Sequence, residues 1–203
     1  MLKILIAGFP VLFFLGLSAW AQTPVLRELT SRDHGISLDL RYATTNNFTG
    51  IVLYPCPRCY LHPRVADALL RAAKDFQKQG YRILLFDCYR PVSVQQRLWE
   101  KVPDARFVTP PEKGSMHNRG AAIDITLIDL KSGKPLDMGT PYDFFGREAY
   151  MDFNGLSKLA ASNRTILHST LKRYGFRGIR TEWWHFSFIG AGATVLDWTW
   201  TCL

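Results

Sequence analysis

The sequence predicts a single α+β domain with a mainly antiparallel sheet flanked by helices. Its 203 residues are consistent with one domain, and no internal repeat or low-complexity tract divides them. Hydrophobic residues make up 47% of the chain and charged residues 21%, which is enough apolar surface for a packed core. The β-type runs are few and do not alternate strictly with the helical ones, as a parallel sheet would require.

The N-terminus differs from the rest of the chain. Lys3 precedes an uncharged apolar run, and Ser-Ala-Trp-Ala at residues 18–21 is typical of a cleavage site. We expect residues 1–21 to be a signal peptide that is cut after Ala21. The apolar run is too short for a membrane anchor, which needs roughly 20 residues. Residues 22–203 are then an exported, soluble domain with no stable membrane insertion.

The net charge of +8 is spread along the chain. Lys and Arg form no run of five or more, and no nucleic-acid-binding motif is present. We therefore expect a solvated basic surface and no nucleic-acid partner. The sequence favours no particular oligomeric state.

Four cysteines follow the predicted signal peptide, and an even number in an exported protein indicates disulfides. Three pairings are possible, and the sequence does not select one. One Cys-x-x-Cys spacing also occurs in redox motifs and zinc knuckles, but neither a second such pair nor a thioredoxin-like βαβ pattern accompanies it. The cysteines are Cys56, Cys59, Cys88 and Cys202.

The first elements of the domain show two clear periods. Apolar and mostly polar residues alternate over 36–43, which predicts a half-buried strand that ends with Tyr42 on its inner face. From Pro63 the apolar residues recur at spacings of three and four, and Gly80 suits a C-terminal stop. The pattern predicts an amphipathic helix between these two residues.

The middle of the chain contains two apolar runs separated by a helix and a loop. Residues 81–87 are short, apolar and β-capable, so they predict a buried strand, and a second helix is expected over about 92–102. Residues 103–119 form a loop by composition, and residues 121–130 are another β-type run. Asp124 lies inside this second run.

The C-terminal third of the chain begins with turn signals over 131–150. Apolar residues from Leu156 to Tyr174 then predict a long helix that is closed by Gly175. The last predicted strand covers 181–189.

Two short segments contain the residue types of a catalytic metal site. His117 stands where a loop meets a strand, and Asp124 is a carboxylate within an apolar run, which is costly unless it is paired or bound to a cation. Glu182 and His185 lie among aromatic residues of the last predicted strand. Two imidazoles and one carboxylate make a three-ligand zinc site with an open fourth position, and a nearby glutamate supplies a base. Arg90, after a buried strand, adds a cation for an oxyanion.

The spacing of Glu182 and His185 imposes one geometric requirement. On a regular strand the two side chains face opposite sides, because their positions differ by three. A bulge or the end of the strand must therefore turn one of them into the site.

The sequence resembles the VanX-type D-alanyl-D-alanine dipeptidases, zinc peptidases whose fold is shared with D,D-carboxypeptidases and the Hedgehog signalling domain. The pattern Ser-x-His-x-x-Gly-x-Ala-x-Asp, paired with Glu-Trp-Trp-His, is specific to this resemblance. The resemblance covers nearly the whole predicted domain, through residues 38–44, 47–50, 87–91, 115–124, 138–144 and 182–185. It implies a Hedgehog/D,D-peptidase-like fold.

The resemblance also implies roles for the residues that match the family's motifs. His117, Asp124 and His185 would hold one Zn²⁺ per chain. Glu182 would act as general base and then general acid, and Arg90 would stabilise the developing oxyanion.

Two further residues, Ser115 and Asp143, match family positions near the bound dipeptide, and Tyr42 is another candidate for the same pocket. Together with the export signal, the resemblance implies hydrolysis of D-Ala-D-Ala in the periplasm. Two alternatives remain: a zinc D,D-carboxypeptidase that trims peptidoglycan stem peptides, and a non-catalytic zinc-dependent binding protein. Glu182 argues against the second, because a structural zinc site needs four ligands and no spare base.

Overall fold

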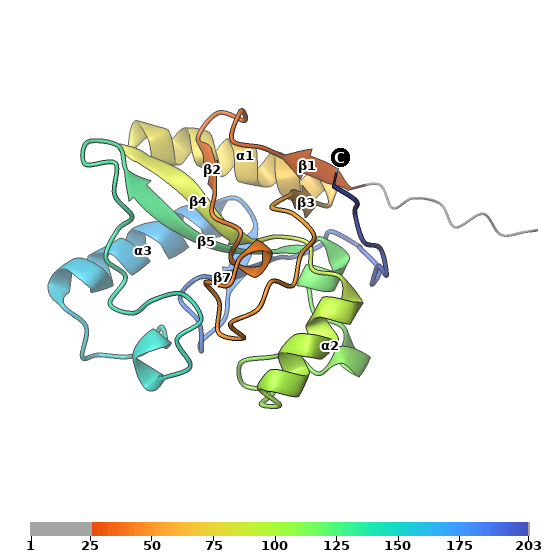
Figure 1. Cartoon of the computed structure of the whole chain (residues 1–203). Helices are drawn as coiled ribbons and strands as arrows, with labels where there is room; N and C mark the ends of the chain where they lie inside the picture. The colour runs from red at the N-terminus through yellow and green to blue at the C-terminus, as the bar shows by residue number, and fades with distance from the viewer. Residues whose placement is uncertain (1–25, 203) are drawn as a thin grey trace, which may run out of the picture.

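A computed structural model describes residues 26–202 of the chain (Figure 1). The predicted signal peptide and its cleavage site lie outside the described residues. Of the helices in the described part, none is long and apolar enough to span a membrane.

A five-stranded sheet forms the centre of the fold. Its strand order is β2-β4-β5-β7-β6, with β2 and β4 parallel and the other three pairs antiparallel, so the predicted α+β class and mainly antiparallel sheet are confirmed. A separate two-stranded antiparallel sheet joins β1 (Arg27–Leu29) to β3 (Cys59–Leu61). The strands of the main sheet are β2 (Ile36–Leu38), β4 (Tyr81–Asp87), β5 (Ala122–Asp129), β6 (Phe176–Gly178) and β7 (His185–Phe188).

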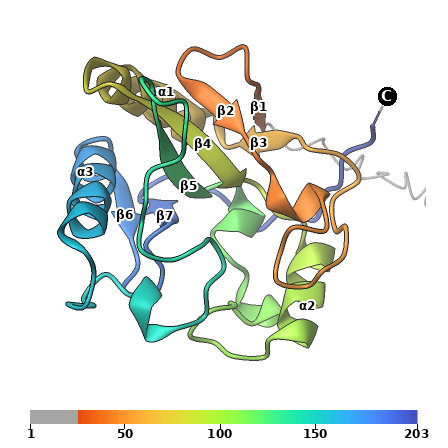
Figure 2. The same cartoon turned by 60° about the vertical axis from the view of Figure 1, so that its left-hand side comes forward.

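Two long helices, α1 (Pro63–Lys78) and α3 (Lys158–Arg173), pack on the sheet and contact each other, whereas α2 (Val92–Lys101) lies apart from both (Figures 1 and 2). The apolar stripe of α1 that the sequence predicts is buried from Val65 to Phe76. This stripe and the buried side of α3 enclose the main core against the sheet. The predicted positions of α1, β4, α2 and β5 are therefore confirmed to within about two residues.

The predicted strand over 36–43 is too long. β2 ends at Leu38, and residues Arg41–Ala43 form a single 3₁₀ turn in which the Ala43 N–H donates to Leu40 O. Tyr42 is nevertheless 2% exposed, because the turn directs its ring inward. Alternation of apolar and polar residues does not distinguish a strand from a strand followed by such a turn.

The predicted strand over 181–189 is also too long, since residues 181–184 are irregular and β7 begins at His185. The long C-terminal helix is confirmed, but Leu156 precedes it and Tyr174 follows it. Three strands, β1, β3 and β6, were not predicted. Each has three residues, too few to show a period.

A second, mostly aromatic cluster joins the C-terminal segment to the body of the domain. Trp200 packs against Tyr54, Tyr60 and Tyr89, with ring centroids 5.1–6.3 Å apart. The hydroxyl of Tyr89 also donates to Trp198 O at 2.7 Å. The last residues described are therefore part of the folded domain.

Two disulfides account for the four cysteines, Cys56–Cys202 and Cys59–Cys88. The two members of the Cys-x-x-Cys spacing thus pair with distant partners and not with each other. This arrangement excludes a redox motif formed by that spacing in the folded protein.

Candidate metal centre and active site

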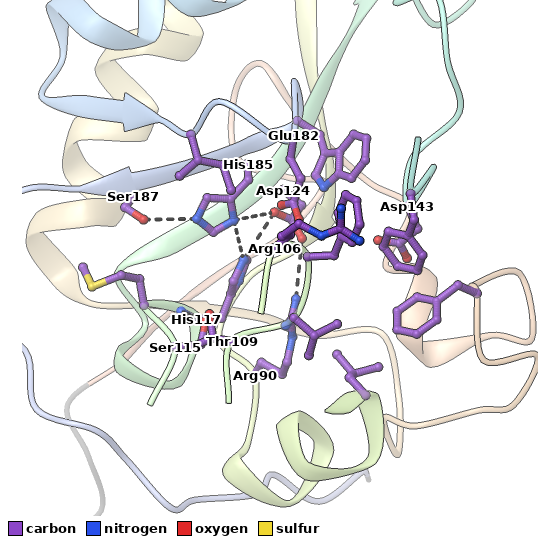
Figure 3. Close-up of a pocket in the computed structure, with 18 of the residues that line it drawn as sticks. Arg90, Arg106, Thr109, Ser115, His117, Asp124, Asp143, Glu182, His185 and Ser187 are labelled. Atoms are coloured by element: carbon purple, nitrogen blue, oxygen red, sulfur yellow. Dashed lines mark hydrogen bonds and ion pairs between the residues drawn. The ribbon is translucent and has the colours of Figure 1, made fainter. Parts of the chain in front are cut away.

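Three neighbouring strands place acidic and imidazole side chains at one end of the sheet. Asp87 at the end of β4 is in register with Asp124 of β5, and Asp124 is in register with His185 at the start of β7. His117 comes from a 3₁₀ turn just before β5, and Figure 3 shows its ring directed at Asp124 and His185. The structure therefore brings the three predicted metal ligands together.

The ligand atoms of these three residues form a nearly equilateral triangle. His117 Nε2 lies 3.1 Å from His185 Nδ1 and 3.3 Å from Asp124 Oδ1. His185 Nδ1 lies 3.1 Å from the same carboxylate oxygen. In a tetrahedral zinc site with bonds of about 2.0–2.2 Å, neighbouring ligand atoms lie about 3.3–3.6 Å apart. The triad thus needs little adjustment to hold a metal ion with the fourth position open.

The outer nitrogen of each imidazole has its own partner. His117 Nδ1 lies 2.7 Å from Cys88 O. Because a carbonyl oxygen can only accept, Nδ1 carries the hydrogen and Nε2 keeps a lone pair for the metal. His185 Nε2 lies 3.1 Å from Ser187 Oγ, which leaves Nδ1 as the ligand atom of this ring.

The pKa values of Asp124 and His185 are shifted in the directions that favour metal binding. Burial raises the pKa of Asp124, but the charges and hydrogen bonds of His117 and His185 outweigh this and bring the pKa well below its usual value. Burial lowers the pKa of His185, and the Asp124 carboxylate opposes this only in part. Tyr142 donates to Asp124 Oδ2 at 3.0 Å, so Oδ1 remains directed at the imidazoles. A carboxylate and neutral imidazoles are the forms that coordinate metals.

Arg90 is fixed beside the triad. Its Nε and Nη2 donate to Asp87 Oδ2 at 2.9 and 2.7 Å, and its Nη1 donates to Gln95 Oε1 at 2.9 Å. Burial lowers the pKa of Arg90, but the Asp87 charge outweighs this and holds it above its usual value. These bonds use three of the five guanidinium N–H groups, and Nη2 also lies 3.6 Å from Asp124 Oδ2 (Figure 3).

Glu182 lies in the irregular segment just before β7 and lines the same cavity as the triad (Figure 3). Because β7 begins only at His185, the end of the strand supplies the turn that the sequence spacing requires. Burial raises the pKa of Glu182, and the negative charges of Asp124 and Asp143 raise it further. A raised pKa suits a group that takes up and returns a proton near neutral pH.

Asp143 lies across Asp124 from His185 in the view of Figure 3. With φ at 59°, it is the one non-glycine residue with positive φ in the described part of the chain. Burial raises the pKa of Asp143 well above its usual value, and Asp124 adds to the effect. Tyr42 donates to its Oδ2 at 3.2 Å. A half-buried carboxylate in a left-handed backbone conformation is typical of a ligand-binding position.

Ser115 stabilises the turn that carries His117 and also lines the cavity. Its N–H donates to Asn118 Oδ1 at 2.7 Å, and its Oγ accepts from the His117 N–H at 3.2 Å. These bonds shape the turn that carries His117. Ser115 also lines the cavity, and its hydroxyl hydrogen is still available to donate.

The cavity that contains all of these side chains is small, with a volume of about 240 Å³. Three phenylalanines from separate loops line it and contact one another: Phe145 lies 4.9 Å from Phe48 and 5.1 Å from Phe107 between ring centroids. Phe145 is two residues from Asp143, so this aromatic wall stands on the Asp143 side. Pockets for drug-sized ligands are typically about 300–1,000 Å³, so the cavity suits a smaller molecule.

Sequence reasoning assigned no role to several residues that complete the site. Asp87 begins segment 87–91, which carries part of the family resemblance, and its position at the end of an apolar strand is the signal that the sequence offers. Tyr142 adjoins Asp143 but carries no signal of its own. The aromatic wall of Phe48, Phe107 and Phe145 is formed by loops that only the fold brings together.

Comparisons with known proteins agree with this site. Residues 25–202 match the family model described as D-Ala-D-Ala dipeptidase. The D-alanyl-D-alanine dipeptidase of Escherichia coli is 36% identical over 176 residues, which cover 87% of this chain and 91% of that protein. The enzyme of the same name from Enterococcus faecium is 34% identical over 173 residues, which cover 75% and 86%.

Among solved structures, VanYB in complex with D-alanine-D-alanine has a TM-score of 0.43 and 16% identity, and the match covers 66% of this chain and 74% of that one. The family match extends over the whole described domain, including the residues of the metal triad. The chain therefore belongs to the D-Ala-D-Ala dipeptidase family of metallopeptidases.

Proposed function

We propose that this protein is an exported zinc dipeptidase that hydrolyses D-Ala-D-Ala to free D-alanine. The observation that carries the proposal is the content of one small cavity. It holds a triad that could bind a metal, the carboxylate of Glu182, the guanidinium of Arg90 and, on another side, the half-buried carboxylate of Asp143. The identity of the substrate is supported by the name of the family and of the relatives reported above.

Zinc suits the ligand set, since two imidazole nitrogens and one carboxylate oxygen are common ligands of catalytic zinc. Zinc held there would supply a Lewis acid and would lower the pKa of a water molecule toward about 7. The hydrogen bonds from His117 to Cys88 O and from Tyr142 to Asp124 hold two of the ligands in the required orientation.

Glu182 is the proposed proton carrier. Its carboxylate takes a proton from the attacking water and then donates it to the amine that leaves when the peptide bond breaks. Proton transfer of this kind contributes typically 10²–10⁴ in rate. The high pKa of the buried Glu182 side chain favours the second transfer, because the protonated form is the donor.

Arg90 is the proposed donor to the oxyanion that forms when water adds to the peptide carbonyl. Asp87 and Gln95 hold the guanidinium in place before substrate arrives, so little reorganisation is needed during the reaction. One preorganised donor of this type is commonly worth about 3–4 kcal/mol in the transition state.

Asp143 is the proposed partner of the substrate's free ammonium group. A cation there compensates a carboxylate whose burial otherwise favours protonation. Tyr42 orients the carboxylate through its hydroxyl. The hydroxyl of Ser115 is directed to the same cavity and is a candidate donor to the substrate.

The aromatic wall favours the dipeptidase over the D,D-carboxypeptidase. A stem peptide continues beyond the amino group of its penultimate D-alanine, and Phe145 and Phe107 contact each other in the lining of the cavity that holds Asp143. An acylated substrate would also lack the ammonium group that Asp143 is proposed to bind. A dipeptide meets neither obstacle.

The export of the protein is supported by two features. Residues 1–21 have the composition of a signal peptide, and both pairs of cysteines form disulfides, which persist in oxidising compartments. A periplasmic enzyme would act on dipeptides that are released from the wall or present outside the cell.

The proposal is tested by assaying the purified zinc-loaded domain on D-Ala-D-Ala and on N-acetyl-D-Ala-D-Ala, with and without a chelator. We expect hydrolysis of the free dipeptide that the chelator abolishes and zinc restores. A preference for the acetylated compound would identify a D,D-carboxypeptidase. Zinc and dipeptide binding without hydrolysis would identify a binding protein.

A further inference from the structure

The disulfide Cys59–Cys88 lies next to the metal centre. Cys88 directly follows β4, and its carbonyl oxygen accepts the 2.7 Å hydrogen bond from His117 Nδ1. Both cysteines are buried, at 0% and 2% exposure. The disulfide therefore joins a strand of the small β1–β3 sheet to the residue that orients a predicted metal ligand.

The main sheet does not hold this part of the chain. The register between β4 and β5 shifts between Leu85 and Asp87, and β4 ends at Asp87. Beyond that point the backbone is held by hydrogen bonds outside the sheet. The Cys88 N–H donates to Asp87 Oδ1 at 2.9 Å, the Tyr89 N–H to Tyr60 O at 2.9 Å and the Arg90 N–H to His117 O at 3.1 Å, and Arg90 O accepts from Asn118 Nδ2 at 2.7 Å. The Cys59–Cys88 disulfide is the covalent restraint on this segment.

We propose that the Cys59–Cys88 disulfide is a positioning element of the metal centre. It holds the Cys88 carbonyl where it fixes the hydrogen on Nδ1 of His117 and the plane of the ring, so that Nε2 points at the metal. The inference rests on the metal-dependent function proposed above. Partners that orient a metal-binding imidazole in this way typically contribute 10–100-fold to metal affinity or activity.

The second disulfide provides a matched control within the same chain. Cys56–Cys202 ties the C-terminal segment to the loop before β3, and neither residue bonds to the triad. It closes a loop with a sequence separation of 146, against 29 for Cys59–Cys88. In the chain-entropy account the longer loop gives the larger stabilisation. If the disulfides act only through stability, removing Cys56–Cys202 should lower both Tm and zinc affinity more than removing Cys59–Cys88 does. If Cys59–Cys88 positions the metal ligand, its removal should lower zinc affinity more.

The test compares wild type with C59A/C88A and C56A/C202A. Zinc affinity is measured by competition with a chromophoric chelator, ligand geometry by the visible spectrum of the Co²⁺-loaded protein, and stability by the Tm of the metal-free protein. We expect C59A/C88A to bind zinc at least about 10-fold more weakly and to show an altered Co²⁺ spectrum. C56A/C202A should bind zinc within about twofold of wild type while losing more in Tm.

Equal zinc affinity in wild type and C59A/C88A, or an equal fall in both double variants, would overturn the inference. If C59A/C88A does not fold, C59V/C88A restores part of the lost volume, and the same comparison applies to it. Failure of the wild-type protein to bind zinc would instead overturn the proposed function. The two failures are thus distinguished by the wild-type measurement alone.

Discussion

Asp87 Oδ2 accepts hydrogen bonds from both Nε and Nη2 of Arg90, and neither side chain is more than 9% exposed. The second oxygen of Asp87 is also occupied, since Tyr54 donates to it at 2.6 Å and the Cys88 N–H at 2.9 Å. The carboxylate is therefore fully bonded, and it sets the position of the guanidinium next to the metal triad. Arg90 lines the cavity that holds the triad, and Asp87 is fully buried behind it.

Replacing Asp87 with asparagine should damage activity and stability together. The amide keeps the shape of the side chain but removes the charge that compensates Arg90, and a buried charge left without its partner costs about 3–5 kcal/mol. We expect kcat to fall about 10–100-fold, because the guanidinium loses its fixed orientation. Steady-state kinetics and urea unfolding measure the two effects.

The matched control is Asp75→Asn, which removes an ion pair of similar length, 2.8 Å to Arg173, on the surface. Exposed pairs of this kind contribute about 0–1 kcal/mol, so this variant should remain close to wild type. Equal losses in the two variants would show that Asp87 has no special role.

Replacing Glu182 with glutamine should abolish proton transfer and leave the metal in place. Glu182 is not one of the three clustered ligands, so the metal content should be unchanged. We expect kcat to fall by about 10²–10⁴. Metal analysis and kcat are measured on the same preparation, with Glu148→Gln as the control because this glutamate is exposed. Activity near the wild-type level would remove Glu182 from the mechanism.

The sequence predicts the triad because two of its members stand at unusual places in their own segments. His117 ends a loop and Asp124 interrupts an apolar run, and both signals are local. The orientation of Glu182 could not be predicted from the local sequence, because it depends on where β7 begins, which is at His185. The spacing of Glu182 and His185 therefore predicts that the strand must be interrupted, but it does not predict where the interruption lies.

The residues that surround the ligands depend on contacts between distant segments. Asp87 and Arg90 are only three positions apart in the sequence, whereas Asp87 and its partner Tyr54 are 33 positions apart. Phe107 and Phe145 meet across the cavity from two loops, and loop composition predicts irregular backbone without predicting its partner. The pairing of the cysteines was open for the same reason, since three pairings satisfy the sequence equally.

Replacing Phe145 with alanine should relax the selection against acylated substrates. The change removes the ring that contacts both Phe48 and Phe107 and opens the wall beside Asp143. We expect the ratio of kcat/KM for N-acetyl-D-Ala-D-Ala to that for D-Ala-D-Ala to rise about 10-fold or more, the effect of a few methylene groups in a pocket. Phe144→Ala is the control, since this neighbouring ring is 38% exposed and is not among the side chains that line the cavity.

An unchanged ratio in Phe145→Ala would show that the ring does not exclude the acyl group. A rise in the same ratio in Asp143→Asn but not in Phe145→Ala would assign the selection to charge and not to size. Measuring both variants on both substrates therefore separates the two contributions.

His168 should make the stability of the protein depend on pH below neutrality. Its Nε2 donates to Trp183 O at 2.9 Å, which anchors the segment between Glu182 and β7 to α3. Burial lowers the pKa of His168 from 6.5 to about 4. Between these values the unfolded chain binds a proton that the folded protein does not, so stability rises with pH in this range. The contribution is complete above pH 6.5 and is lost as the pH falls toward 4, with a full size of about 3 kcal/mol.

The replacement His168→Gln keeps an N–H donor for Trp183 O but does not titrate. We expect the free energy of unfolding of this variant, measured in urea at a series of pH values, to vary less steeply than that of wild type between pH 6.5 and 4. His34→Gln, at an exposed position, should retain the wild-type slope. If the His168 variant keeps that slope as well, the acid sensitivity arises elsewhere, and the anchor between α3 and the Glu182 segment does not depend on a neutral imidazole.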